Sequence, residues 1–295
     1  MSAAPVGFIG TGRMGTPMAG HLLDAGVPLV VHDARADAAR PLLARGAVWA
    51  ASPGEVADRA PTIVTIVPSS REVEAVYADL LPRLGPGHLL IEMTSADPPS
   101  TRRLAGEVAA RGAAMLDAPV SGGVKGAVEG TLAIMVGGEA ADLARARPLL
   151  ERLGTKIFHV GGIGAGHAMK LVNNMTSAAC LVATAEALAV AVRAGIDPAR
   201  AAEILSASSG RSNASELKFP RYILPGTFDS GFTITLMTKD VDGFMRLAAA
   251  MGVEAPVALA AAEYFRRALH GPLAAEDHTA IARVLGFRGP EGEQR

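Results

Sequence analysis

The sequence predicts a chain of two parts: an α/β half with a mostly parallel sheet, then an all-α half joined to it by one long helix. Two observations carry this prediction. Short apolar runs alternate with amphipathic segments as far as about residue 163, as strands joined by crossover helices do. From residue 167 to about residue 290 only helical periodicity remains. We therefore expect domains at residues 1–163 and 164–295.

The strand candidates of the first half are short, mainly apolar runs. They occupy residues 6–10, 28–33, 62–67, 88–93, 114–120, 132–138 and 156–161. Helical patterns such as MAGHLLDAG and EVEAVYADLLPRL stand between them. Because parallel strands need a long crossover connection, this alternation favours parallel neighbours.

The second half opens with residues 169–195, which read as one long helix that ends at Gly195. Asp197-Pro198 starts the next helix, since proline suits a first turn. Residues 206–231 mix helical fragments with turns, and residues 239–270 hold two helices divided near Pro256.

Composition excludes several classes of protein. A chain of 295 residues with 49% apolar residues and a net charge of −1 suits about two globular domains, and it lacks the basic balance of a partner for nucleic acid or an anionic membrane. The single cysteine, Cys180, allows no intrachain disulfide and is expected in the core, which fits a cytoplasmic protein. We expect no signal peptide, no transmembrane helix, because Glu186 and Arg193 interrupt the apolar stretches, and no metal site.

The stretch GTGRMG gives the pattern G-x-G-x-x-G with Gly10, Gly12 and Gly15 between the first strand and the first helix. Such a loop permits a tight turn, close approach of a pyrophosphate to the backbone, and close packing of helix on strand. Arg13 and Met14 lie within it. The loop could be a purely structural turn, but its context favours a dinucleotide site.

Asp33 ends the second strand candidate, 23 residues after Gly10 (33 − 10). A carboxylate there accepts hydrogen bonds from ribose hydroxyls and repels a 2′-phosphate. Arg35 lies close enough in sequence to receive such a phosphate instead. We therefore expect NAD in preference to NADP.

Two further motifs carry polar groups suited to catalysis. In DAPVSGG, the turn Ser121-Gly122-Gly123 presents a hydroxyl and two unhindered backbone N–H groups, which suit a carboxylate or oxyanion. In GAGHAMKLVNN, Lys170 and Asn174 are four residues apart and share one helix face, beside Asn173. A lysine facing a cleft can exchange a proton with a carbonyl or hydroxyl oxygen, although Lys170 could also be a solvated residue at a helix start.

The stretch TLMTKDV places Lys239-Asp240 in an apolar helical setting. The lysine could reach a cofactor or form a surface ion pair, and both readings stay open.

Together, GFIGTGRMGTPMAGHL, DAPVSGG, GAGHAMKLVNN and GFTITLMTKD resemble the β-hydroxyacid dehydrogenase family in order and spacing, from about residue 6 to residue 287. The resemblance implies a Rossmann-like domain, a long interdomain helix, a helical domain for substrate binding and oligomerisation, and an active site in the cleft between domains. It also implies homodimers or homotetramers and a small hydroxy acid or semialdehyde as substrate.

The resemblance further implies roles for individual residues. Lys170 matches the family's catalytic lysine. The other matches are Ser121, Gly122, Gly123 and Asn174 for substrate, and Val67, Pro68, Ser95 and Lys239 for the cofactor. Two departures stand out: Glu92-Met93 where the family often has Asp-Ser, and Thr11 in place of a common leucine.

The substrate is left open between several acids. SSGR at residues 208–211 is similar to 3-hydroxyisobutyrate dehydrogenases and favours a small branched 3-hydroxy acid. Lys125, just after the SGG turn, favours a more polar acid such as tartronate semialdehyde. Reduction of glyoxylate or succinic semialdehyde also fits. Imine reductases usually lack the lysine, so Lys170 argues against that reaction, and the complete set of polar residues argues against a dinucleotide-binding protein without catalysis.

Overall fold

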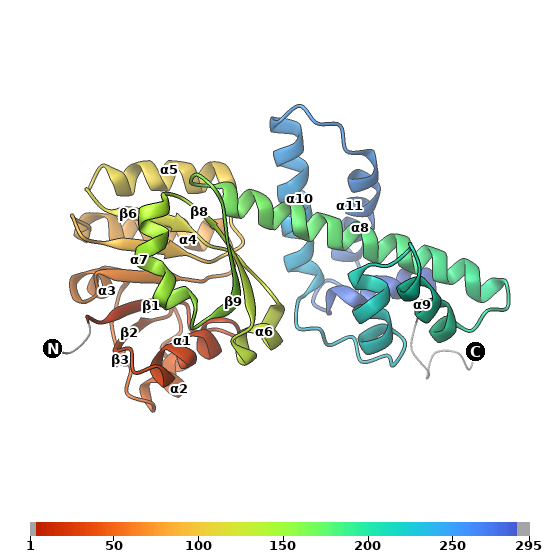
Figure 1. Cartoon of the computed structure of the whole chain (residues 1–295), viewed down its shortest axis with the longest axis horizontal. Coiled ribbons are helices and arrows are strands. Elements are labelled where there is room, and N and C mark those ends of the chain that lie inside the picture. Colours follow the sequence, from red (N-terminus) through yellow and green to blue (C-terminus); the bar gives the residue numbers. More distant parts are fainter. Residues whose placement is uncertain (1–3, 288–295) are drawn as a thin grey trace. The chain divides into compact units, whose positions relative to one another are not determined.

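The computed structural model describes residues 4–287, which divide into two compact units after Lys170 (Figure 1). Each unit has its own apolar core. The dinucleotide-binding and substrate-binding roles expected of residues 1–163 and 164–295 stay predictions.

The first unit is built on a nine-stranded sheet with the strand order β3-β2-β1-β4-β5-β6-β8-β7 and β9 beside β8. The pairs from β3 to β6 are parallel, β8 runs antiparallel to β6 and β7, and β9 is parallel to β8. The mostly parallel sheet that the sequence predicts is therefore confirmed. The strands are β1 Val6–Ile9, β2 Leu29–His32, β3 Val48–Trp49, β4 Thr62–Thr65, β5 Leu89–Glu92, β6 Ala114–Asp117, β7 Val120–Ser121, β8 Leu132–Gly137 and β9 Gly154–Gly161.

Helices cover both faces of this sheet, because successive strand residues point to opposite sides. Phe8 belongs to the core beneath α1, α2, α6 and α7, whereas its neighbour Ile9 belongs to the core beneath α3, α4 and α5. These helices are α1 Gly15–Asp24, α2 Arg40–Leu43, α3 Pro53–Arg59, α4 Ser70–Leu80, α5 Pro98–Ala109, α6 Gly123–Glu129 and α7 Ala140–Leu150, with short 3₁₀ turns at Ala36–Ala39 and Leu81–Arg83.

The sequence missed β3, β7, α3 and α6. The two strands have two residues each, too few to show a period. The expected single strand over residues 114–120 is in fact two, β6 and β7, because Pro119 between them has no N–H to donate to the sheet.

The second unit is helical, as predicted, and its core gathers around α8 (Figure 1). The helices are α8 Ala165–Arg193, α9 Pro198–Ala207, the π-helix η3 Ala214–Ile223, α10 Ile234–Ala250, α11 Pro256–Leu269 and the 3₁₀ segment η4 His278–Leu285. α8 begins four residues earlier than the predicted residue 169. α9 starts where Asp197 predicts, since its carboxylate accepts a hydrogen bond from the Arg200 N–H at 2.8 Å.

By length and composition, α8 could cross a bilayer, and it is the one helix of the described residues that could. Core helices of water-soluble proteins pass the same test. The apolar residues of α8 from Met175 to Leu188 pack in the helical core, and Lys170 and two asparagines interrupt its first part. These features are typical of a helix that packs one face on the core of its domain.

Candidate active site

The residues expected to bind a dinucleotide lie at the carboxyl ends of neighbouring parallel strands. The glycine loop follows β1, Asp33 follows β2, Val67-Pro68 follows β4 and Ser95 follows β5. In open parallel sheets, ligands bind outside this edge. The sheet therefore brings together the cofactor-binding residues that the sequence predicts in the first unit.

The three glycines of the loop differ in what surrounds them. A Cβ on Gly10 would lie 2.0 Å from the Ile66 carbonyl oxygen, and one on Gly15 would lie 1.8 Å from the Gly10 carbonyl oxygen. These two glycines are required by the fold. A Cβ on Gly12 would meet no atom within 4 Å, so the fold places no demand on this position and leaves its backbone open to a phosphate.

Asp33 holds the loop from the end of β2. One carboxylate oxygen accepts the Thr11 N–H at 2.7 Å and lies 3.3 Å from the Thr11 hydroxyl, which also donates to it. The other accepts the Arg35 N–H at 2.9 Å. Thr11 thus supplies an anchor that the usual leucine could not supply through its side chain. The Oδ1 atom, which accepts only the Arg35 N–H within the described residues, keeps a further lone pair for a ribose hydroxyl.

Two consecutive hydrogen bonds link the loop after β4 to the end of β5. The Val67 N–H donates to the Thr94 hydroxyl at 3.0 Å, and the Thr94 N–H donates to the Glu92 carboxylate at 2.7 Å. The predicted residues Val67 and Ser95 therefore flank a loop that Glu92 orders from inside the protein.

The Ser121-Gly122-Gly123 turn leads from β7 into α6. Ser121 pairs with Ala133 of β8, so the sheet fixes the backbone that carries the hydroxyl. Gly122 and Gly123 have φ angles of 133° and 61°, which side chains disfavour. Lys125, one turn into α6, is half-exposed and lies 3.7 Å from Glu129.

The start of α8 is held by Asp117 at the end of β6. Its two carboxylate oxygens accept the Gly164 N–H at 2.7 Å and the His167 N–H at 2.8 Å. A helix start has unpaired N–H groups and a partial positive charge, both of which a carboxylate satisfies. Asp117 thereby ties the motif that carries Ser121 to the helix that carries Lys170.

His167 fills the space between two buried carboxylates. Its Nε2 atom lies 2.9 Å from Glu92 Oε2, and its Nδ1 atom lies 2.7 Å from the Thr101 hydroxyl and 3.7 Å from Asp117 Oδ2. The Nε2 contact is an ion pair by distance only, since neither atom finds a hydrogen bond of good geometry. Burial lowers the pKa of His167, but Glu92 and then Asp117 outweigh it, so the net pKa is raised above 6.5.

The polar face of α8 begins with Lys170, of which 8% is exposed, so it is not the solvated residue that the sequence left possible. Asn174, one turn later in the second unit, donates to Asp240 of α10 at 2.6 Å and accepts from Asn173 at 3.1 Å. Lys239 Nζ lies 3.2 Å from the other oxygen of buried Asp240, without hydrogen-bond geometry. Asp240 therefore holds Asn174 and Lys239 together.

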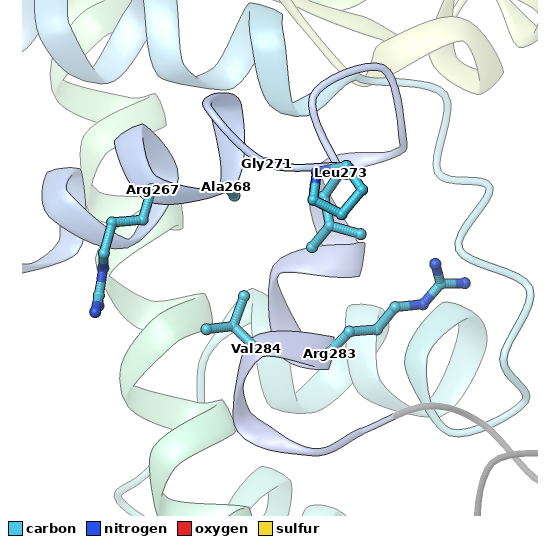
Figure 2. A pocket seen from close by; sticks show the side chains of 7 residues that line it. Arg267, Ala268, Gly271, Leu273, Arg283 and Val284 are labelled. Atoms are coloured by element: carbon cyan, nitrogen blue, oxygen red, sulfur yellow. The ribbon is translucent and has the colours of Figure 1, made fainter.

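A cavity of about 570 Å³ lies elsewhere, among α11, the loop after it and η4 (Figure 2). Figure 2 shows Arg267 and Arg283 on opposite sides of it, with guanidinium groups that do not converge. Arg283 also pairs with Glu276. None of the predicted site residues lines this cavity, so it is not the candidate site. Among residues 4–287, no cluster of His, Cys, Asp or Glu is arranged to hold a metal ion.

Sequence reasoning gave no role to Asp117, Glu92, His167 or Asp240. A signal for the first three was present: two neighbouring strand candidates each end in a carboxylate, and Glu92 and Asp117 are register partners. His167 lies between these two carboxyl groups, and their proximity raises its pKa.

Known proteins resemble both parts of the chain. Residues 5–162 match the NAD binding domain of 6-phosphogluconate dehydrogenase. Residues 164–285 match the family described as the NAD-binding domain of NADP-dependent 3-hydroxyisobutyrate dehydrogenase. The chain is thus an oxidoreductase that binds NAD or NADP.

Three proteins illustrate the range of relatives. Mitochondrial 3-hydroxyisobutyrate dehydrogenase of Mus musculus is 40% identical over 81% of this chain and 74% of its own length. The 2-(hydroxymethyl)glutarate dehydrogenase of Eubacterium barkeri is 36% identical over 95% of this chain and 94% of its own. The structure of Mycobacterium tuberculosis 3-hydroxyisobutyrate dehydrogenase with L-serine superposes with a TM-score of 0.90 at 34% identity, over 96% of this chain and 99% of that one.

Proposed function

This chain belongs to the 3-hydroxyisobutyrate dehydrogenase family of β-hydroxyacid dehydrogenases, and on that premise we propose that it oxidises a small β-hydroxy acid of the 3-hydroxyisobutyrate type with Lys170 as general base. The observation that carries the proposal is Lys170 itself: a buried lysine on the first turns of a helix whose start is fixed by Asp117.

The cofactor we propose is NAD rather than NADP. It supplies a nicotinamide ring that accepts the hydride. Gly10, Gly12, Arg13, Met14 and Gly15 would hold the pyrophosphate, and Asp33 the adenosine ribose. The Asp33 carboxylate disfavours a 2′-phosphate, although exposed Arg35 lies beside it. A strong preference for NADP, measured as kcat/KM for the two cofactors, would overturn this choice.

Lys170 would take the hydroxyl proton as the substrate is oxidised and return it in the reverse direction. Ser121 and the N–H groups of Gly122 and Gly123 would bind the substrate carboxylate. Asn174 is held by Asp240, so its position is fixed before substrate arrives. We propose that it orients the substrate hydroxyl or Lys170.

Replacement of Lys170 by alanine tests this proposal. Because a general base is lost, kcat should fall by a factor of about 10² to 10⁴. The affinity for NADH, measured by fluorescence, should be unchanged. Lys156→Ala, at an exposed lysine of β9, is the matched control and should keep full activity. Near-normal turnover by the Lys170→Ala variant would remove Lys170 from the mechanism.

L-Serine is a second candidate substrate, because it is bound in the similar structure from Mycobacterium tuberculosis. It has an amino group where 3-hydroxyisobutyrate has a methyl group. Tartronate semialdehyde, glyoxylate and succinic semialdehyde complete the panel for the reductive direction.

We also propose assembly into dimers or tetramers through the helical unit. One face of α11 closes the core with Ala262 and Phe265, while Val257 and Leu259, on either flank of that face, are 74% and 50% exposed. Light scattering of the purified protein measures the oligomeric state directly. The cytoplasmic location stays a prediction, since the relatives include a mitochondrial enzyme.

A further inference from the structure

Lys218 is a buried lysine of the second unit to which the proposed mechanism gives no role. It lies on the π-helix η3 and is only 5% exposed. Its ammonium donates to the Ser177 hydroxyl at 2.8 Å. Within residues 4–287 no carboxylate comes within ion-pair distance of it.

Such an arrangement is costly in a folded protein. An ammonium has three N–H donors, and in the described part of the chain a single hydroxyl accepts from this one. Burial lowers the pKa of Lys218 to about 8, although Cys180 and Asp277 raise it from further away. A buried charge without a counter-charge destabilises a fold. An anionic ligand would supply the counter-charge that Lys218 lacks. π-Helical segments are rare and occur often at functional sites.

The position of Ser177 connects Lys218 to the proposed active site. Lys170, Asn174 and Ser177 stand at i, i+4 and i+7 on α8 and therefore share one helix face. The rise along the helix from Lys170 to Ser177 is about 10 Å. A glutarate-length substrate with a hydrogen bond of about 3 Å at each end spans a comparable distance.

We propose that Lys218 binds a second carboxylate at the far end of the substrate's α-substituent. The favoured substrate is then a β-hydroxy acid with a distal carboxylate, and 3-hydroxyisobutyrate, which has a methyl group there, is a poorer one. This inference rests on the proposed function and narrows its substrate class. Charge-assisted pairing in a desolvated site supplies the preference.

Lys125 is the other lysine that could select polar acids. It lies 3.7 Å from Glu129 and its side chain is 54% exposed. Its charge therefore has both a partner and solvent, and it gains little from an additional carboxylate.

The test compares 2-(hydroxymethyl)glutarate with 2-(hydroxymethyl)pentanoate, which has a methyl group in place of the distal carboxylate. For the wild-type enzyme with its cofactor, kcat/KM should favour the dicarboxylate by about tenfold or more. Lys218→Met should abolish this ratio while turnover of the pentanoate is kept. Lys125→Met and the exposed-site control Lys156→Met should preserve it.

Several results would overturn the proposal. The wild type could show the same kcat/KM for the glutarate and the pentanoate, the ratio of the two values could be unchanged in the Lys218→Met variant, or that ratio could instead be lost in the Lys125→Met variant. Lys218→Gln serves as a second variant if the methionine protein does not fold. Failure of the proposed function is distinguishable, because then no β-hydroxy acid is oxidised at all.

Binding of glutarate itself gives a readout without turnover. Calorimetry in the presence of NADH should show about tenfold weaker binding to the Lys218→Met variant than to the wild type, or about 1.4 kcal/mol. Equal binding to the two proteins would contradict the role of Lys218.

Discussion

Two buried basic side chains of this protein have very different surroundings. His167, at the start of α8, faces Glu92 at 2.9 Å and Asp117 at 3.7 Å. Lys218, in the helical unit, donates to the Ser177 hydroxyl, and no carboxylate among residues 4–287 lies within ion-pair distance of it. Burial acts against the charge of both groups, but the carboxylates raise the net pKa of His167, whereas that of Lys218 falls to about 8.

The number of nearby carboxylates separates a group that stabilises the fold, His167, from one that we propose binds a ligand, Lys218. The first cluster balances its histidine with acids and uses Asp117 to fix the helix start. The second leaves its lysine uncompensated within the described chain. A charge retained at a cost to stability marks a functional position, so the two clusters should respond in opposite ways to substitution and to pH.

The largest effect is expected from Asp117→Ala. This change leaves the Gly164 and His167 N–H groups without their acceptor and removes one of the charges that face His167. Removing one partner from a buried charged cluster costs about 3–5 kcal/mol. Chemical denaturation followed by circular dichroism measures it.

The matched control is Asp58→Ala, at an exposed aspartate that lies 3.4 Å from Arg83. Its effect should stay within about 1 kcal/mol. If the two variants were equally stable, Asp117 would not hold the start of α8.

A pH-dependent effect of intermediate size is expected from His167→Gln. Because the folded-state pKa of His167 is raised, its contribution to the unfolding free energy is complete below about pH 6.5 and is lost as the pH rises through the folded pKa. Within that window the difference between wild type and variant should shrink by about 1.4 kcal/mol per pH unit.

Glu92→Gln provides the internal comparison, since Glu92 contributes most to raising the pKa of His167. In that background the pH dependence should be weaker. A difference that grows toward alkaline pH would mean that His167 is buried neutral.

The smallest effect, and one of opposite sign, is expected from Lys218→Met. An apolar side chain of similar length removes an uncompensated buried charge, so the variant should be more stable by about 1 kcal/mol. The advantage should be greatest below pH 8 and decline toward pH 10.5, because the pKa of Lys218 is lowered from 10.5 to about 8. Thermal unfolding between pH 7 and pH 10 measures it.

Ser177, Cys180, Asp277 and His278 also act on this region. They are the same in both proteins, so the comparison isolates Lys218. A loss of several kcal/mol would instead assign the lysine a structural role.

Periodicity and glycine spacing were enough to predict much of the first unit. Alternating apolar runs predict the parallel strands, and the loop from Gly10 to Gly15 is recognisable because two of its glycines are sterically required. Strands of two residues, such as β3, have no period to detect. The division of residues 114–120 at Pro119 was readable in principle, since proline cannot donate to a sheet.

The polar site was only partly predictable. Lys170 and Asn174 share a face by helical geometry alone, so the sequence could pair them. It could not pair Asn174 with Asp240, which is 66 residues away on another helix, nor Ser177 with Lys218, which is 41 residues away.

The sequence by itself determined the order of the longer strands and most of the helices, the dinucleotide loop and the residues of the polar face of α8, because these depend on local spacing. Tertiary structure decided which of the buried charges are balanced. The balance depends on distances of about 3–4 Å between side chains brought together by folding. In the interior the low dielectric constant strengthens the interaction between neighbouring charges. On that basis His167, with its two carboxylates, stabilises the fold, and Lys218, with its single hydroxyl, is proposed to bind the substrate.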